Sequence, residues 1–326
     1  MIVLSGDIGG TKTRLALFET DGEQLETLVE RTFTSGEYDS LDDIVRGFLE
    51  DTQTTCARAC FGVAGPVQNG RCRTTNLPWE IDAGNLQRDL PLGDVRLLND
   101  LEANAWGISA LGPEDFYVLQ QGAPDARGNA AVIAAGTGLG EAGMYWDGER
   151  HHPFASEGGH TDFSPGSELE IALLRYLRRS FEHVSWERVV CGPGLVNLYR
   201  FLCEHSQSDP PAWLQQELDR GDPAAVIGQA ALTQRDPLCS EALDLFVYLY
   251  GVEAGNQALK LMATGGVYLG GGIAPKILER LKRPMFLEGF TAKGRMSPLL
   301  RQMPVRVILN DRTALYGPAV YVAGSG

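Results

Sequence analysis

Residues 6–17 read GDIGGTKTRLAL, and residues 134–140 read AAGTGLG. Each stretch joins the end of an apolar run to a glycine-rich turn, which is followed by an alternating segment and a second turn. The dipeptide Gly-Thr recurs after 126 residues, at 10–11 and 136–137, and the Asp-Gly-Glu sequence of the second turn recurs after the same interval. Two matches at one spacing predict a duplicated domain, each copy of which carries a glycine-tipped β-hairpin.

Strand-like and helix-like segments alternate along the rest of the chain, which is typical of an α/β fold. The expected strands are short apolar or alternating runs, and the expected helices repeat apolar residues every three or four positions. The expected strands are 2–5, 14–18, 25–33, 59–63, 95–98, 130–135, 267–269 and 305–308. The expected helices are 40–49, 101–111, 168–179, 194–203, 211–219, 223–232, 238–262, 276–281 and 314–322.

The composition is that of a globular, acidic protein. Of 326 residues, 44% are hydrophobic and 21% are charged, and this length suits about two domains. The net charge of −14 argues against nucleic acid and against anionic membrane surfaces as partners. No apolar run reaches the roughly 18 residues of a membrane span, and the N-terminal residues lack the basic start of a signal peptide. We therefore expect a cytoplasmic protein.

The six cysteines form no CxxC pair and show no metal-ligand spacing. Such scattered cysteines are typical of free thiols in a reducing compartment. The sequence thus predicts unpaired, reduced cysteines.

Two nucleotide-binding motifs nearly fit the glycine turns and fail for the same reason. Residues 6–13 miss the Walker A pattern because Thr11 stands where glycine is required, whereas residues 138–143 match GxGxxG. Both motifs must open a helix whose N-terminus binds the phosphates. Here a strand and a turn follow each motif instead, so both nucleotide folds are disfavoured.

The hairpin turns can bind phosphate in another way. Successive backbone N–H groups in a glycine turn form a concave anion site, and glycine allows a ligand to approach closely. Thr11 and Thr137 add hydroxyl donors. Either turn alone is equally well explained as a tight β-turn, but the pair predicts phosphate binding, with the ligand held between the two copies.

The two glycine turns and four further segments resemble bacterial glucokinases of the sugar kinase, Hsc70 and actin superfamily. The turns resemble its first and second phosphate motifs. The other segments are LLNDLEANAWG at 97–107, EGGH at 157–160, WERVVCGPGL at 186–195 and TGGVYLGGGIAPK at 264–276. They resemble the segment of the catalytic aspartate, two sugar-site elements and the adenosine motif, and they occur in the family order along nearly the whole chain.

The resemblance implies a two-lobed actin-like (ribonuclease H-like) ATPase fold, an α/β architecture with duplicated domains and a central cleft. It implies a small lobe of residues 1–109 with 306–326, and a large lobe of residues 110–305. The related ROK kinases follow their EGGH-like histidine with a cysteine-rich zinc motif, whereas His160 leads here into TDFSPGSELE. The resemblance is therefore to the zinc-free glucokinases, and no zinc is expected.

The implied activity is phosphoryl transfer from ATP to the 6-hydroxyl of D-glucose, with Mg²⁺ as cofactor. Such a transfer needs a phosphate cradle, a divalent ion and a carboxylate that accepts the hydroxyl proton. Asp100, at an expected strand-to-helix junction, is implied as the catalytic base. Asp7 is implied as the metal ligand, acting through water because magnesium retains several waters.

The resemblance also implies the binding residues. Sugar ligands are carboxylates, amides or imidazoles, which can make paired hydrogen bonds to neighbouring hydroxyls. The implied sugar ligands are Asn76, Asn99, Asp100, Glu157, His160 and Glu187. The implied nucleotide-binding residues are Gly6, Asp7, Ile8, Gly9, Gly10, Thr11, Gly136, Thr137, Gly138, Gly270, Gly271 and Gly272.

Most of these residues also have a plainer explanation. Asp100 or Asn99 can be the N-cap of the helix that follows. Glu157 and His160 can belong to a surface turn, and Glu187 can be a solvated glutamate. Each glycine segment can serve as a turn or a helix entry.

Other functions stay open at this point. A kinase of this kind could act on another hexose, such as fructose, mannose or an N-acetylhexosamine. A non-catalytic sugar sensor is disfavoured, because repressor relatives carry a DNA-binding domain before the first phosphate motif and five residues precede Gly6 here. The expected partners are D-glucose and ATP, and the resemblance implies a homodimer.

Overall fold

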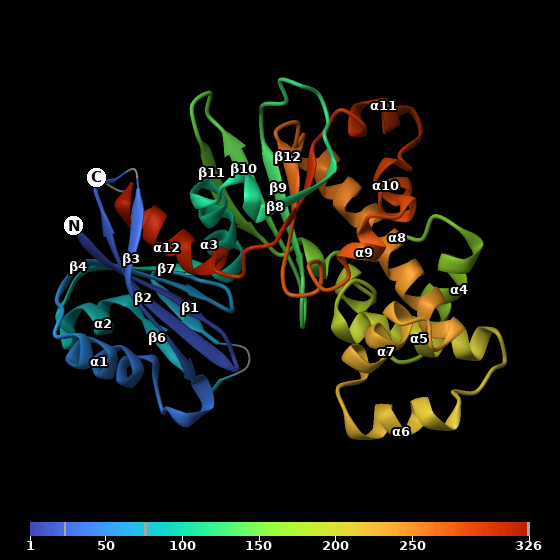
Figure 1. The fold of residues 1–326 in the computed structure, drawn as a ribbon, viewed down its shortest axis with the longest axis horizontal. Helices are drawn as coiled ribbons and strands as arrows, with labels where there is room; N and C mark the ends of the chain where they lie inside the picture. Colours follow the sequence, from blue (N-terminus) through green and yellow to red (C-terminus); the bar gives the residue numbers. More distant parts are fainter. Residues whose placement is uncertain (23, 75–76, 325–326) are drawn as a thin grey trace. The chain divides into compact units, whose positions relative to one another are not determined.

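The chain forms two compact units in the computed structural model, which describes residues 1–22, 24–74 and 77–324 (Figure 1). The lobe boundaries expected from the sequence stay a prediction. Unit 1 comprises residues 1–115, 152–155 and 310–326, and unit 2 comprises residues 116–151 and 156–309.

Unit 1 is built on a sheet with the strand order β3-β2-β1-β4-β7. β1 pairs antiparallel with β2 and parallel with β4, and β4 pairs parallel with β7. Strands β5 and β6 form a separate small hairpin. The strands are β1 (Ile2–Ile8), β2 (Lys12–Thr20), β3 (Leu25–Thr34), β4 (Cys56–Val63), β5 (Arg71–Arg73), β6 (Glu80–Asp82) and β7 (Leu92–Asn99).

Helices cover both faces of this sheet. They are α1 (Leu41–Thr52), α2 (Ala83–Asp89), α3 (Asp100–Gly107) and α12 (Thr313–Ala323). Side chains of β1 alternate between two hydrophobic clusters, so that Leu4 packs with α1 and α2 whereas Val3 packs with α3 and α12. Burial on both faces explains why β1 and β4 read as nearly continuous apolar runs.

Unit 2 contains a sheet with the order β11-β10-β9-β12-β13-β8. β9 pairs antiparallel with β10 and parallel with β12, and β12 pairs parallel with β13. The strands are β8 (Phe116–Gln120), β9 (Ala130–Ala135), β10 (Leu139–Trp146), β11 (His151–Ser156), β12 (Gly266–Gly270) and β13 (Val305–Ile308).

The two sheets repeat one topology. The orders β3-β2-β1-β4-β7 and β11-β10-β9-β12-β13 correspond strand by strand, with an antiparallel first hairpin followed by parallel neighbours. The duplication predicted from the spacing of the glycine turns is therefore confirmed, and both turns lie at hairpin tips. Strand β8 adds an antiparallel edge to the second copy only.

The helices of unit 2 surround the long helix α8 (Pro237–Leu261), orange in Figure 1. Its buried side chains belong to one large hydrophobic cluster that includes residues of β9 and β12. The other helices are α4 (Glu168–Leu177), α5 (Gly192–His205), α6 (Ala212–Arg220), α7 (Pro223–Leu232), α9 (Leu278–Leu281), α10 (Pro284–Thr291) and α11 (Ser297–Leu300).

Glycines inside α8 permit its close contact with α10. A Cβ atom at Gly251 would overlap the carbonyl oxygen of Phe286, and one at Gly255 would overlap that of Phe290. On the facing helix, a Cβ atom at Gly289 would overlap the carbonyl oxygen of Tyr248. These glycines lower helix propensity, but the backbone contact that they allow outweighs that cost.

We expect Gly251→Ala to destabilise unit 2 by about 1–3 kcal/mol, because the added methyl group forces α8 and α10 apart. The matched control is Gly228→Ala in α7, where a Cβ atom would lie 4.0 Å from Leu195 Cδ2. Alanine there should leave stability unchanged or raise it by up to about 1 kcal/mol. Urea unfolding of both variants is the measurement, and equal midpoints would contradict the proposed contact.

Candidate active site

The first glycine turn is fixed by a serine that follows β3. Ser35 is fully buried, and its hydroxyl donates to the Gly9 carbonyl at 2.8 Å. Its backbone N–H donates to the Thr11 carbonyl at 3.0 Å, and the Gly9 N–H donates to the Lys12 carbonyl at 3.0 Å. These bonds hold the turn in one conformation while Thr11 stays exposed.

Two residues predicted to bind nucleotide lie in the core of unit 1. A Cβ atom at Gly6 would lie 2.5 Å from Phe61 and 2.9 Å from Leu15, so packing alone requires glycine there. The Ile8 side chain is buried as well. Only backbone groups of Gly6 and Ile8 could contact a ligand.

The carboxyl ends of three neighbouring parallel strands bring the first turn and Asp100 to one edge of the sheet. Ile8 of β1 pairs with Val63 of β4, which pairs with Asn99 of β7. Asn99 Nδ2 also donates to the Gly65 carbonyl at 3.2 Å. Ligand-binding groups of α/β sheets gather at this edge, so the placement of Asp100 suits a functional residue.

Asn99 is the N-cap of α3. Its Oδ1 accepts a hydrogen bond from the Leu101 N–H at 2.9 Å, and its backbone is extended. Asp100 is the first helical residue, and its Oδ1 accepts from the same N–H at 2.9 Å. Since Asn99 already occupies the cap position, capping alone does not account for an aspartate at 100.

Asp7 lies on β1 directly opposite Arg14 of β2. Burial raises the pKa of the Asp7 carboxyl, and the Arg14 guanidinium partly opposes that rise. A divalent cation would favour the ionised form, and Mg²⁺ commonly uses one or two protein carboxylates together with substrate phosphates. The Asp7 carboxyl, on the strand that leads into the first turn, has the chemistry of a magnesium ligand. Within residues 1–22, 24–74 and 77–324, no group of three or more His, Cys, Asp or Glu could hold a metal ion.

The second glycine turn and the GGG segment lie at the ends of neighbouring parallel strands in unit 2. Gly270 ends β12 and pairs with β9, which leads into the turn at Gly136. Gly271 has a φ of +77°, and a Cβ atom there would overlap the Ala135 carbonyl. A Cβ atom at Gly136 or Gly272 would meet open space. The two glycine segments thus lie at neighbouring strand ends, and among the described residues neither Gly136 nor Gly272 has a neighbouring atom on its Cβ side.

Glu157 precedes a short 3₁₀ turn, η4 (Gly158–His160), and His160 is the last residue of that turn. His160 Nε2 lies 3.9 Å from Glu157 Oε2, and both side chains are more than half exposed. A Cβ atom at Gly158 would overlap Glu141 Oε2, and one at Gly159 would overlap the Leu139 carbonyl. The backbone of this turn is therefore fixed against β10, which begins at Leu139, whereas its two polar side chains are accessible.

Glu187 lies in another 3₁₀ turn, η5 (Trp186–Arg188), and contacts the second glycine turn. Its Oε2 accepts from the Leu139 N–H at 3.0 Å. The backbone N–H of Trp186 donates to the Thr161 carbonyl at 3.0 Å, and this bond joins η5 to the residue that follows η4. Glu187 is half-buried and hydrogen-bonded, which a freely solvated glutamate would not be.

The structure thus gathers the predicted residues into two sets. Unit 1 holds Asp7, the first turn, Asn99 and Asp100, and unit 2 holds the second turn, the GGG segment, Glu157, His160 and Glu187. Asn76 lies outside the described residues. Sequence reasoning missed Ser35 and Glu141, because each acts through contacts with segments that are distant in the sequence.

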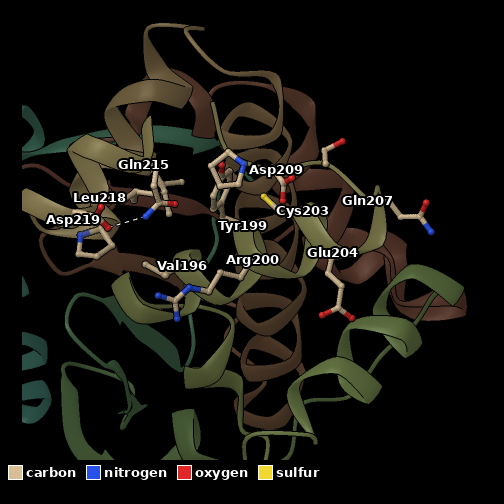
Figure 2. Close-up of a pocket in the computed structure, with 14 residues that line it drawn as sticks. Val196, Tyr199, Arg200, Cys203, Glu204, Gln207, Asp209, Gln215, Leu218 and Asp219 are labelled. Atoms are coloured by element: carbon tan, nitrogen blue, oxygen red, sulfur yellow. Dashed lines mark hydrogen bonds between the residues drawn. The ribbon is translucent and has the colours of Figure 1, made fainter. Parts of the chain in front are cut away.

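A separate cavity of about 600 Å³ lies in unit 2 among α5, α6 and α7 (Figure 2). Tyr199, Arg200, Cys203 and Asp219 are among its lining residues. None of the predicted site residues lines it, so it is distinct from the predicted glucose and nucleotide sites.

No helix within the described part of the chain is long and apolar enough to span a membrane.

Known proteins resemble this chain over its full length. A family model described as Glucokinase matches residues 4–325. A glucokinase of Nostoc punctiforme is 43% identical over 337 residues, which cover 99% of each chain. Another, from Synechocystis, is 41% identical and covers 99% of this chain and 98% of its own.

Solved structures of glucokinases also resemble this chain. A glucokinase from an Antarctic psychrotroph superposes with a TM-score of 0.87 at 31% identity, covering 99% of both chains. A glucokinase from Balamuthia mandrillaris, solved in complex with glucose, has a TM-score of 0.76 at 22% identity and covers 99% of this chain and 93% of its own. These likenesses confirm the α/β, actin-like ATPase fold that the sequence predicts.

Proposed function

The chain belongs to the glucokinase family, and we propose that it transfers the terminal phosphoryl group of ATP to the 6-hydroxyl of D-glucose, which gives glucose 6-phosphate and ADP. The observation that carries this proposal is the full-length match to glucokinases at up to 43% identity. The gathering of the predicted polar residues around the two glycine turns supports it.

Nucleotide phosphates are bound by backbone N–H groups of the two turns, with hydroxyl donation from Thr11 and Thr137. The GGG segment, which adjoins the second turn, receives the adenosine part. Asp7 would hold Mg²⁺, through water, and the bound ion would supply neutralisation of the phosphate charge. A cation beside Asp7 would favour the ionised form of its carboxyl. Without the cation, burial raises the pKa of that carboxyl.

Glucose is bound by Asn76, Asn99, Glu157, His160 and Glu187, and Asp100 acts as the base. As the 6-hydroxyl oxygen forms its bond to the terminal phosphorus, the bond from that phosphorus to the bridging oxygen breaks, and ADP leaves with that electron pair. The hydroxyl proton passes to the Asp100 carboxylate. Glu187 also accepts the Leu139 N–H, so it links the sugar ligands to the second phosphate turn.

The test is a coupled assay of glucose 6-phosphate formation by the purified full-length chain with ATP and Mg²⁺. We expect kcat/KM for glucose to exceed that for fructose, mannose and N-acetylglucosamine by roughly 5- to 150-fold, because one lost hydrogen bond to a buried site group costs roughly 1–3 kcal/mol. A higher value for another hexose would favour the second candidate, a kinase for that sugar. No turnover with any hexose would contradict the proposal.

We also propose that the protein is a homodimer and that it acts in the cytoplasm. The proposed lobes are those expected from the sequence, residues 1–109 with 306–326 and residues 110–305. Sedimentation analysis at micromolar concentration tests the dimer, since a mass equal to the 35.4 kDa of one chain would refute it.

A further inference from the structure

A pair of buried glutamates lies behind the turn that carries Glu157 and His160. Glu141 of β10 is 2% exposed, and Glu253 of α8 is fully buried. The two carboxyl groups interact with each other. Within the described chain, Oε1 of each is buried without a hydrogen-bond partner. A proton on one of the two carboxyl groups would supply a hydrogen-bond donor for the other, because a protonated carboxyl becomes a donor.

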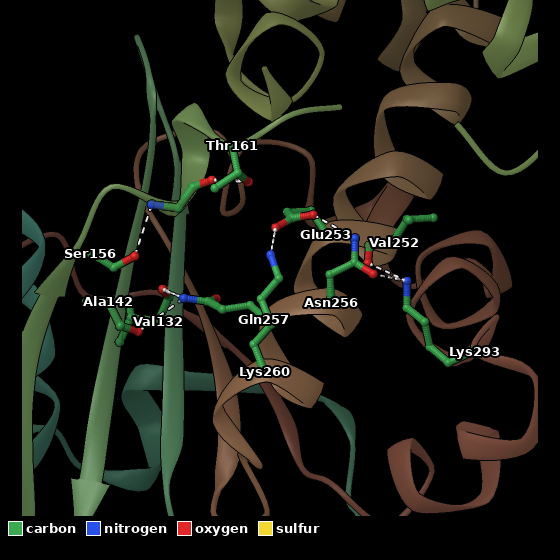
Figure 3. Close-up of polar contacts among 11 residues, drawn as sticks. Val132, Ala142, Ser156, Thr161, Val252, Glu253, Asn256, Gln257, Lys260 and Lys293 are labelled. Carbon is green, nitrogen blue, oxygen red and sulfur yellow. Dashed lines mark hydrogen bonds and ion pairs between the residues drawn. The ribbon is translucent and has the colours of Figure 1, made fainter. Parts of the chain in front are cut away.

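The surroundings decide which glutamate carries the charge. Lys260 Nζ lies 3.7 Å from Glu253 Oε1, and Asn256 Nδ2 donates to Glu253 Oε2 at 2.8 Å (Figure 3). Lys293 Nζ donates to Asn256 Oδ1 at 2.6 Å, which orients that amide. Burial raises the pKa of the Glu253 carboxyl as well. The contacts with Asn256 and Lys260 oppose that rise, so they favour ionised Glu253 and leave the proton on Glu141.

The proton on Glu141 is held at physiological pH. Burial, and then the charge of Glu253, raise the pKa of the Glu141 carboxyl to about 8. The titratable and charged groups that interact with this pair come from α8 and from the segment after α10. They are Tyr250, Lys260 and Lys293.

Glu141 contacts the turn directly. Gly158 packs so closely on Glu141 Oε2 that a Cβ atom would overlap it. The rest of the turn is closed by local bonds, from the Gly158 N–H to Ser156 Oγ at 3.0 Å and from Thr161 Oγ1 to the Gly158 carbonyl at 2.7 Å (Figure 3). A change of charge on Glu141 therefore acts on the backbone between the two proposed sugar ligands.

We propose that the uncharged Glu141 carboxyl is a positioning residue for the turn of Glu157 and His160, and that glucose affinity falls when this carboxyl loses its proton. If Glu141 loses its proton beside the charged Glu253, its carboxylate needs contact with water or a cation. Gly158 packs directly on that carboxyl, so the turn is the element that moves to let water or a cation in. This inference rests on the proposed function of the turn in glucose binding.

The experiment compares the full-length wild type with Glu141→Gln, in which a neutral amide replaces the neutral acid. If only the protonated form binds well, the wild-type glucose KM should be roughly tenfold higher at pH 9 than at pH 7, because the competent fraction falls to about a tenth. Glu141→Gln should match the wild-type KM at pH 7 and stay nearly flat to pH 9. The KM for ATP should not follow this profile in either protein.

Glu170→Gln is the matched control. Glu170 is another buried glutamate of unit 2, bonded to the Gly166 N–H and to Ser167 Oγ, and its variant should keep the wild-type pH profile. Calorimetric titration with glucose at pH 7 and pH 9 gives the same comparison without turnover. A wild-type glucose KM that is flat to pH 9, or the same rise in Glu141→Gln, would overturn the inference. Either result requires an active wild type, so it is distinct from failure of the proposed function.

Stability gives a second readout. Between pH 4.5 and 8 the folded protein retains the Glu141 proton that the unfolded chain loses, so the free energy of unfolding falls as pH rises through this window. Glu141→Gln lacks this proton difference. Its thermal midpoint should therefore rise relative to that of the wild type as pH increases from 5 to about 8. Parallel midpoints over that range would contradict a proton held on Glu141.

Discussion

Asp100→Asn should lower kcat for glucose phosphorylation by about 10²–10⁴-fold while glucose remains bound. The substitution keeps the size of the side chain and removes the acceptor for the 6-hydroxyl proton. At 1.36 kcal/mol per decade, the loss corresponds to about 2.7–5.5 kcal/mol of activation free energy. The measurement combines kcat with the calorimetric Kd for glucose and the thermal midpoint of the same preparation.

The structure indicates that this variant should fold. The cap of α3 is Asn99, and an asparagine at 100 keeps an Oδ1 that can accept the Leu101 N–H. A matched control for the loss of a cap is Ser40→Ala, because Ser40 Oγ accepts from the Asp43 N–H at the start of α1. That control should lose about 0.5–2 kcal/mol of stability and retain kcat. A kcat for Asp100→Asn within tenfold of the wild type would refute the assignment of Asp100 as the base.

The two hairpins and the positions of most strands were predictable because their signals are local. A glycine turn between two apolar segments predicts β1-β2 and β9-β10 whatever surrounds them, and the repeated spacing predicts that the two sheets correspond. The N-cap of α1 at Ser40 was predictable for the same reason, since its bond reaches only three residues along the chain. The expected helix from 101 to 111 ends as an α-helix at Gly107 and continues as a 3₁₀ turn, Ile108–Ala110. A Cβ atom at Gly107 would overlap the Thr313 carbonyl.

Other features depend on contacts that no sequence window contains. The edge strand β8 is only partly buried and pairs with β13, far along the chain, so its own apolar pattern is weak. Glycines at 158 and 159 look like an ordinary turn until β10 packs against them. Glu141 is recognised as a buried acid only in the folded chain, where burial and then the neighbouring Glu253 of α8 raise the pKa of its carboxyl. From the sequence alone, Glu187 cannot be distinguished from a surface glutamate. The structure shows that it accepts a hydrogen bond from the Leu139 N–H.

Glu157→Gln and His160→Ala should each weaken glucose binding by about 1–3 kcal/mol, or roughly 5- to 150-fold, with little change in the KM for ATP. Each variant removes a hydrogen-bonding group from the sugar. Because the two side chains lie 3.9 Å apart, the double variant tests whether their contributions add. Fully additive losses would total about 2–6 kcal/mol.

The control for these variants is a second exposed histidine–carboxylate pair in unit 2. His183 Nε2 lies 3.0 Å from Asp162 Oδ1, close to the same turn, and neither residue is a predicted sugar ligand. His183→Ala should leave the Kd for glucose unchanged, because a surface pair of this kind contributes only about 0–1 kcal/mol to stability and touches no substrate. Glucose titration calorimetry and ATP kinetics on all four variants decide the matter. If the Kd for glucose stays within twofold in Glu157→Gln and His160→Ala while the KM for ATP rises, the turn between them contacts the nucleotide and not the sugar.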